Sequence, residues 1–288
     1  MKRIGISTDC MCDLPSDYTS SNDVNILQFY IHTSGGRFKN ESEITSDNIV
    51  DYFESGNVFL RFSVPEPKEC KEYFLELLTR YNEVIHITAS DKIGMSYPNA
   101  KAALELMGKA AKRIILINSG SIEAGLGHMV QMAVRLRDSG SSADNIVRAC
   151  GALRERISSS FIIPNADYLH RMGYVGRRVK KLCDFFNIHL VLCTKDGRLA
   201  VKSFHIGSYD KALMRYIRSE LRHERRIDKR QLFITHAGCS SKLISQLKEK
   251  AESLCRFDRI TVTKASVFVS DCGGPRSVGM MYVYRQEM

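Results

Sequence analysis

Apolar residues recur along the chain with two spacings, and their alternation predicts strands followed by helices. Val84 to Thr88 and Arg113 to Ile117 are short apolar runs rich in β-branched residues, which is typical of buried parallel strands. Each run leads into a loop of small residues and then into apolar positions that repeat every three or four residues, which indicates a helix. The pattern predicts two consecutive strand–loop–helix units and a parallel sheet.

The segment before these units predicts further elements of the same kind. Arg3 to Thr8 and Asn25 to His32 are expected to be strands, because both are apolar and the first ends in a loop rich in Asp, Pro and Ser. Ser46 to Glu54 and Pro65 to Tyr81 have helical spacing, and Ser46 is a candidate N-cap. Loops after such strands lie where open α/β sheets place their binding sites.

From Ser158 onward the apolar runs are shorter and alternate. The turn from Lys195 to Arg198, with Asp196-Gly197 at its centre, predicts a hairpin between two of them. Helical spacing returns only in two stretches of this half. We expect an α/β protein of two domains. Residues 1–155 would form a three-layer α/β/α parallel-sheet domain, residues 156–288 a two-layer α/β domain with a mixed sheet, and a ligand cleft would lie between them.

Composition supports a globular chain. Hydrophobic residues make up 44% of the 288 positions and charged residues 26%, a balance that disordered chains do not have. No stretch approaches the ~18 consecutive apolar residues of a membrane span, and the chain opens without an apolar signal segment. We therefore expect a cytoplasmic protein.

The nine cysteines are scattered, and only Cys10 and Cys12 are close in sequence. An odd, dispersed set in a chain expected in the cytoplasm predicts reduced thiols, and a lone CxC lacks the further ligands of a structural metal site. We predict no metal and no cofactor.

Positive charge is concentrated in one part of the chain. Residues 154–230 hold 18 Lys and Arg against 8 Asp and Glu, so this stretch carries the whole net charge of +10. A solvated face explains such a stretch, as does a docking site for an acidic partner or an anionic membrane. No nucleic-acid-binding motif accompanies it, so we expect no nucleic-acid partner.

The common catalytic signatures are absent from the sequence. The chain has no phosphate loop of the GxxxxGK[ST] type, no GxGxxG after a strand, no GxSxG and no HExxH. His86, His128, His205 and His236 lie in or near apolar segments, where a structural role is commoner than a catalytic one. The loops that open helices instead offer free backbone N–H groups. Such groups bind carboxylates and phosphates, or are satisfied by ordinary capping side chains.

These loops, in their order, resemble the motifs of the DegV family, bacterial fatty-acid-binding proteins related in fold to dihydroxyacetone kinase domains. TDCMCDLP at 8–15 is similar to the family's TDSxxDLP, and SVPEP at 63–67 to its SQPSP. The remaining matches are ITASDKIGMSYPNA at 87–100, NSGSIEAGLG at 118–127, YLHRMGYVGRRVKKLCDFFNI at 168–188 and GGPRSVG at 273–279. Together they cover nearly the whole chain.

The resemblance implies a two-domain protein that holds a long-chain fatty acid in a buried tunnel. It also implies that a separate fatty acid kinase phosphorylates the bound acid, while the binding subunit itself is not an enzyme. The 13 Phe and 11 Met would suit such a tunnel, although core packing explains them equally well.

The sequence departs from the family where the carboxylate should bind. Gly94 and Phe62 replace its carboxylate-binding Ser and Thr, Cys272 replaces a His, and Tyr174 replaces an Arg. Because a buried carboxylate without partners is costly, we expect a remodelled anion site. The candidate groups are Ser63, Ser96, Arg276 and the backbone N–H groups of Met95 and Gly273.

Two alternatives remain open at this point. A cysteine-dependent enzyme would use Cys272 beside Asp271, but it would need a base that the sequence does not identify. A divergent member would bind another anionic lipid or small ligand, or would have lost ligand binding altogether, with a tunnel filled by side chains such as Phe62.

Overall fold

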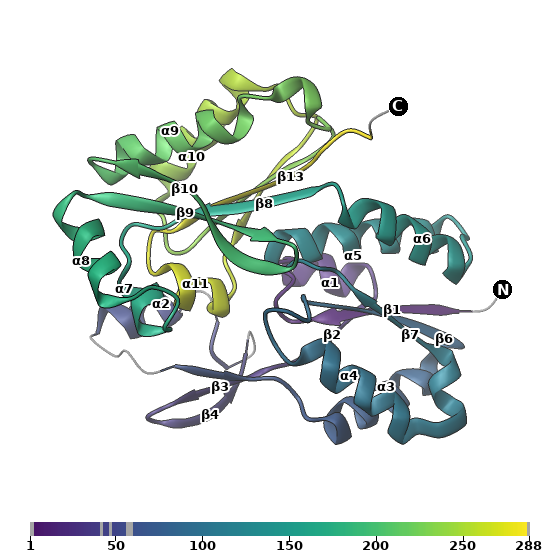
Figure 1. Ribbon diagram of the computed structural model, residues 1–288. Coiled ribbons are helices and arrows are strands. Elements are labelled where there is room, and N and C mark those ends of the chain that lie inside the picture. The colour runs from purple at the N-terminus through teal and green to yellow at the C-terminus, as the bar shows by residue number, and fades with distance from the viewer. Residues whose placement is uncertain (1–2, 41–42, 46–47, 56–59, 287–288) are drawn as a thin grey trace. The chain divides into compact units, whose positions relative to one another are not determined.

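The computed structural model describes residues 3–40, 43–45, 48–55 and 60–286, and Figure 1 shows its elements. Contacts between residues divide the chain into two compact units. The first unit consists of Met1–Ile44, Phe59–Glu155 and Asp196–Arg198, and the second of Thr45–Val58, Arg156–Lys195 and Leu199–Met288. The chain therefore passes between the units more than once. The simpler division after residue 155 stays a prediction.

A four-stranded parallel sheet forms the centre of the first unit. Its strands, in spatial order, are β2 (Val24–Leu27), β1 (Ile4–Asp9), β6 (Glu83–Thr88) and β7 (Ile114–Asn118). Ile6 in β1 pairs with Val24 on one side and Ile85 on the other, so β1 lies inside the sheet. The two strand–loop–helix units predicted from the sequence are confirmed, with strands that begin or end within one residue of the expected positions.

Helices cover both faces of this sheet, which gives three layers (Figure 1). The helices α3 (Pro67–Arg80) and α4 (Ser96–Met107) lie on one face, and α1 (Ser16–Ser21), α5 (Glu123–Asp138) and α6 (Ala143–Arg154) lie on the other. Phe74 and Leu77 of α3 pack with Ala103 of α4 in a buried cluster. α3 begins with a capping box between Glu66 and Glu69, which satisfies N–H groups at the helix start. After α4, residues Gly108–Arg113 form a short 3-10 helix.

A second, three-stranded sheet in the first unit was not predicted. It consists of β4 (Gly36–Lys39), β3 (Tyr30–Thr33) and β5 (Arg61–Ser63), all antiparallel. The prediction of a single strand over Asn25–His32 is wrong. The chain leaves the parallel sheet after Leu27, and Phe29 is buried with its N–H directed at the Cys10 sulfur, 3.4 Å away. Burial of Phe29 outside the sheet separates β2 from β3.

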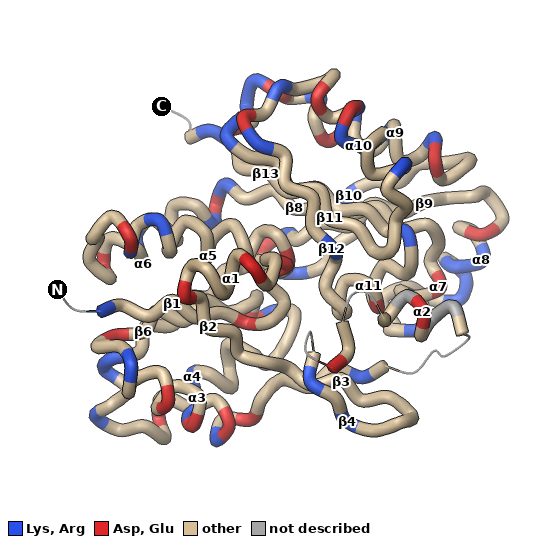
Figure 2. The backbone as a smooth tube through the Cα atoms, turned by 180° about the vertical axis from the view of Figure 1, so that it is seen from behind, with Lys and Arg blue, Asp and Glu red and all other residues tan. Residues whose placement is uncertain are grey.

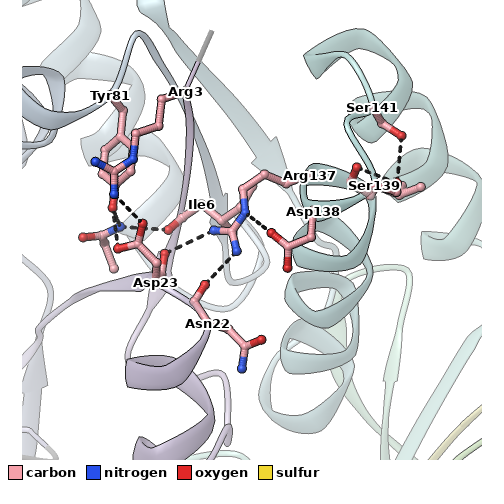
Figure 3. A network of polar contacts seen from close by, with 11 residues as sticks. Arg3, Ile6, Asn22, Asp23, Tyr81, Arg137, Asp138, Ser139 and Ser141 are labelled. Carbon is pink, nitrogen blue, oxygen red and sulfur yellow. Dashed lines mark hydrogen bonds and ion pairs between the residues drawn. The ribbon is translucent and has the colours of Figure 1, made fainter. Parts of the chain in front are cut away.

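Polar contacts fasten the amino-terminal end of β1 to its neighbours (Figure 3). The Asp23 carboxylate pairs with Arg3 at 3.2 Å and accepts a hydrogen bond from the Tyr81 hydroxyl at 2.7 Å. Arg137, from the last turn of α5, donates to the carbonyl oxygens of Asn22 at 2.8 Å and Asp23 at 3.3 Å. One cluster thus joins the start of β1, the turn before β2 and the end of α5.

The second unit contains a six-stranded mixed sheet. Its strands, in spatial order, are β10 (Arg198–Ile206), β9 (Ile188–Lys195), β8 (Ile157–Ile162), β13 (Val278–Val283), β11 (Leu232–His236) and β12 (Ile260–Lys264). The β11–β12 pair is parallel, whereas β13 runs antiparallel to both of its neighbours. Asp196 and Gly197 have φ values of 50° and 77°, as a tight hairpin turn requires. The predicted hairpin and mixed sheet are confirmed.

Helices pack on both faces of this sheet as well. On one face α9 (Tyr209–Leu221) and α10 (Ser241–Leu254) bury a large apolar cluster that includes Tyr216 and Leu247. On the other face, Phe161 and Leu192 pack against Leu169 of α7 (Asp167–Arg171) and Cys183 of α8 (Arg177–Phe185). Periodicity did not reveal these short helices, and so the predicted two-layer domain has a partial third layer.

The remaining helices of this unit are α2 (Asn48–Glu54), the 3-10 turn Glu224–Arg226 and α11 (Val267–Gly273). The N-cap expected at Ser46 lies outside the described residues. In the described part of the chain, no helix combines the length and the apolar character that crossing a membrane requires.

Candidate functional site

The carboxyl end of β1 carries a fully buried carboxylate, Asp9. Its Oδ2 atom accepts hydrogen bonds from the Ala89 N–H and from the Ser96 hydroxyl, both at 2.7 Å. The Nε2 atom of His86 lies 3.5 Å from its Oδ1 atom. Ala89 follows β6 and Ser96 begins α4, so Asp9 ties the ends of two neighbouring strands to the start of a helix. The carboxyl ends of the strands form the edge of the sheet where the sequence predicted a binding site.

A buried polar chain continues from His86 away from this edge. The Nδ1 atom of His86 shares a hydrogen bond of 2.9 Å with the Ser7 hydroxyl, which shares one of 2.7 Å with the Tyr73 hydroxyl. Phe74 packs edge-on against the His86 ring at 5.1 Å. Burial raises the pKa of Tyr73 above its usual value. His86 is therefore a buried core residue whose Nδ1 atom is hydrogen-bonded, whereas its Nε2 atom has only the 3.5 Å approach to Asp9.

Three of the predicted ligand residues lie together in the loop that opens α4. The Ser96 side chain is buried and donates to Asp9, whereas Met95 is 57% exposed. A Cβ atom at Gly94 would meet nothing within 4 Å. The space that a serine side chain would occupy at position 94 is therefore open.

Two other predicted residues, Phe62 and Ser63, are neighbours in β5 and so point to opposite faces of the small sheet. Phe62 pairs with the fully buried Ile31, while the Ser63 hydroxyl shares a 2.9 Å hydrogen bond with Nε2 of His32. Both residues line a pocket of about 700 Å³, together with Arg37, Arg61 and others. His32 and Arg61, which no sequence motif indicated, also line this pocket.

The remaining predicted residues belong to the second unit. Cys272 and Gly273 are buried at the end of α11, and Arg276 follows in the turn before β13 with φ of 68°. The Arg276 guanidinium donates to Oδ1 of Asp210 at 2.8 Å, and its side chain is half exposed. It lines a pocket of about 520 Å³ at the start of α10. Arg276 thus already has one carboxylate partner.

The surroundings of Cys272 bear on the enzyme alternative. Its neighbour Asp271 is ion-paired with Arg171. Burial raises the pKa of Asp271 to about 6, although Arg171 opposes the shift. Burial also raises the pKa of Tyr174, and Cys272 adds to this increase. Cys272 therefore affects the phenol of Tyr174, another position that departs from the family motifs.

The loop before α5 holds a second buried acid, Glu123. It is 4% exposed and has φ of 59°, a conformation that is uncommon for a non-glycine residue. Burial raises its pKa to about 8. One turn later, a Cβ atom on Gly127 would lie 2.2 Å from the Cys12 carbonyl oxygen. Only glycine allows this close approach, which explains Gly127 in the GLG stretch.

Sequence reasoning missed Asp9, His32, Arg61 and Glu123 as site residues. Asp9 had a signal, because it lies inside the TDCMCDLP motif at a strand end. His32 and Arg61 had none, since their strands are 28 residues apart and pair only in the folded unit. Among the residues that the structure describes, no group of three or more His, Cys, Asp or Glu side chains could hold a metal ion.

The fold and these loops define a class of α/β proteins with a parallel sheet, a separate mixed sheet and polar loops at strand ends. The model of the family described as "Uncharacterised protein, DegV family" matches residues 3–285. The chain belongs to the DegV family.

Individual relatives agree with this assignment. A DegV domain-containing protein of Caldanaerobacter subterraneus subsp. tengcongensis is 24% identical over 284 residues, which cover 98% of this chain and 99% of the relative. Another from Clostridium acetobutylicum is 26% identical over 202 residues, covering 70% of this chain and 72% of the relative. These matches confirm the resemblance inferred from the motifs.

Solved structures of the family share the fold. A DegV family protein from Thermus thermophilus, described for its fatty acid binding, has a TM-score of 0.85 and 23% identity and covers 98% of this chain and 100% of its own. A protein from Eubacterium ventriosum that binds stearic acid has a TM-score of 0.86 and 18% identity, and covers 99% of this chain and 98% of its own. The predicted α/β fold class is confirmed.

Proposed function

We propose that this protein binds a long-chain fatty acid and is not an enzyme by itself. The observation that carries the proposal is the match in fold over nearly the whole chain to proteins described as binding fatty acids, one of them stearic acid. Membership in the family supports it further. The acid is the only small molecule that the function requires, and no cofactor takes part.

Mass spectrometry of the purified protein tests this function directly. The protein is measured in its native state and then denatured and extracted. We expect about one fatty acid per chain, retained or taken up after incubation with a fatty-acid mixture. A different lipid at that stoichiometry would support the alternative of another anionic ligand, and no ligand after the challenge would reject lipid binding.

The head group is proposed to bind at the positions that correspond to the family's polar contacts. These are Phe62, Ser63, Gly94, Met95, Ser96, Cys272, Gly273 and Arg276. Arg276 would supply charge, and the serines and the N–H groups of Met95 and Gly273 would supply hydrogen bonds. The present partners of Arg276 and Ser96, Asp210 and Asp9, would be exchanged or shared when the ligand binds.

The Arg276→Ala variant tests this head-group set. Losing a charge-assisted hydrogen bond should weaken stearate binding by about tenfold or more. The control is Lys242→Ala, which removes a positive charge from the same 520 Å³ pocket. Equal affinity of the Arg276 variant and the wild type, within about twofold, would remove Arg276 from the set.

We further propose that a separate fatty acid kinase phosphorylates the bound acid. The resemblance to the family's kinase-coupled members supports this partnership, and the chain carries none of the common phosphate-binding loops. The enzyme alternative gains no support, because Cys272 is buried and the neighbouring Asp271 is engaged by Arg171.

A transient contact with anionic membranes is proposed for α8 in the basic part of the chain, which is the stretch with the net charge excess. Lys and Arg residues gather along this helix (Figure 2). Arg177, Arg178 and Lys181 are exposed, and so are the apolar side chains of Leu182 and Phe185, at 54% and 79%. A basic helix with exposed apolar groups is suited to the membrane interface, where a fatty acid would be exchanged. The protein itself would act in the cytoplasm.

A further inference from the structure

One face of the three-stranded sheet carries a row of basic side chains. His32 in β3 lies directly between Arg37 in β4 and Arg61 in β5, because the register pairs it with both. Side chains that face each other across antiparallel strands are neighbours, so the His32 imidazole lies between two guanidinium groups. The row therefore concentrates positive charge on this face.

Two carboxylates of the first unit, Glu66 and Glu69, offset part of this positive charge. Glu69 of α3 lies 3.4 Å from Arg37, whose guanidinium also stacks 3.4 Å from the Tyr30 ring centre. Although partial burial acts to raise it, hydrogen bonds from the Glu66 N–H, Tyr30 and Arg37 hold the pKa of Glu69 below its ordinary value. Glu66 lines the same pocket, but its carboxylate accepts from a backbone N–H of the capping box. Both acids are thus committed to the start of α3 and to Arg37.

Arg61 lies at the other end of the row. Among the residues that the structure describes, no carboxylate forms an ion pair with its guanidinium, and the residue is exposed. Beside it, His32 and the Ser63 hydroxyl hold each other at 2.9 Å. All three line the pocket of about 700 Å³, so a charged fork, an imidazole and a hydroxyl converge on open space.

We propose that this pocket is a carboxylate-binding site formed by Arg61, His32 and Ser63. A single unpaired guanidinium is matched by a single negative charge, and its planar fork fits a carboxylate with two parallel hydrogen bonds. Ser63 also belongs to the head-group set proposed above, whereas Arg61 and His32 do not, so the proposal adds two residues of the first unit that the motifs did not indicate. The carboxylate belongs either to the fatty acid of the proposed function or to a small free acid.

The test compares the wild-type chain with the Arg61→Gln variant, using three probes. Stearate and methyl stearate are titrated by calorimetry, and acetate is titrated by NMR at constant ionic strength with chloride as the reference anion. The Lys101→Gln variant is the matched control, since it removes an exposed positive charge from α4 of the same unit. Arg61 is exposed, so the variant should unfold at the temperature of the wild type, which a thermal scan checks.

Loss of the guanidinium should weaken binding of the carboxylate that this site recognises, stearate or acetate, by about tenfold or more. The same holds for other charge-assisted hydrogen bonds. If stearate loses this affinity and methyl stearate does not, the site holds the lipid head group, and the part of the proposal that rests on the proposed function is supported. If only acetate binding depends on Arg61, the site takes a small free carboxylate. Either result should be reproduced, more weakly, by Ser63→Ala.

The proposal is overturned if neither stearate nor acetate binding changes in Arg61→Gln. That outcome is distinguishable from failure of the proposed function, in which wild-type protein would not bind stearate at all. In the latter case acetate still decides whether the pocket is a carboxylate site.

Discussion

Two buried acids in the first unit differ in the hydrogen bonds that their carboxyl groups accept. Asp9 receives two short hydrogen bonds, from the Ala89 N–H and the Ser96 hydroxyl. Glu123 sits in a comparably buried place, and burial alone raises its pKa to about 8. A carboxyl group that is desolvated without donors binds its proton more tightly. Glu123 is therefore largely protonated at neutral pH.

This state makes the stability of the protein depend on pH in a defined direction. The pKa of Glu123 is higher in the folded chain, about 8, than its ordinary value of 4.5. The folded state then binds more protons than the unfolded state between these values, so this group lowers stability as pH rises from about 4.5 to 8. Glu123→Gln should remove the loss and raise the free energy of unfolding near pH 8 by up to about 4 kcal/mol.

Urea denaturation at several values between pH 5 and pH 9 measures this effect. Glu105→Gln, an exposed position in α4, serves as the control and should shift stability equally at all pH values. A constant difference between Glu123→Gln and the wild type across this range would contradict the assignment.

The candidate site could be predicted from single residues only in part. The motifs located Ser63 and Ser96 near the lost hydroxyls, but not their partners. The Ser96 hydroxyl donates to Asp9, and the Ser63 hydroxyl shares a hydrogen bond with His32. Each partner lies far away in sequence. A motif identifies a residue and its loop, whereas the hydrogen bond that decides its role depends on tertiary structure.

At the level of elements, buried strands and long helices were predicted well because their apolar periodicity is local. β6 and α3 occupy nearly the predicted residues. The short elements failed: β4 and β5 pair only with β3, and α7 and α8 owe their stability to packing on β8 and β9. Short elements have little intrinsic stability, so the local sequence contains little that identifies them.

The link between α5 and the turn before β2 offers a test of element packing. Arg137 is 15% exposed and donates to two carbonyl oxygens of that turn. Arg137→Ala should lower the free energy of unfolding by about 1–3 kcal/mol, because the carbonyls lose charge-assisted donors. The midpoint of urea denaturation measures the change.

Arg135→Ala is the matched control, since Arg135 is an exposed residue in the same last turn of α5. Its replacement should change stability by less than about 0.5 kcal/mol. Similar losses for both variants would mean that the charge of the helix end matters, and not the bonds to the turn.

For the whole molecule, the uneven charge predicts how lipid exchange responds to salt. If α8 contacts anionic membranes, transfer of a fluorescent fatty acid from vesicles containing phosphatidylglycerol should slow as salt rises, because the attraction is screened. At low salt, the Arg178→Glu/Lys181→Glu variant, in which two exposed charges are reversed, should transfer the fatty acid more slowly than the wild type.

The same charge reversal at Arg225 and Arg226, in the 3-10 turn Glu224–Arg226 of the basic stretch, should also slow transfer from anionic vesicles. Neutral vesicles provide the control, because they should show little dependence on salt or on either pair of substitutions. Equal transfer rates from both vesicle types under all conditions would reject the membrane contact.

The β9–β10 turn has a consequence for how the chain acquires its structure during synthesis. Asp196–Arg198 belong to the first unit, where the Ser90 hydroxyl donates to the Gly197 carbonyl at 2.6 Å and the Lys92 ammonium to that of Asp196 at 2.9 Å. These contacts join residues more than a hundred positions apart, and long-range contacts form late. A ribosome that has released only the first 155 residues therefore exposes a unit whose loop after β6 still lacks its partner. The nascent protein cannot complete its first half until well into the translation of its second.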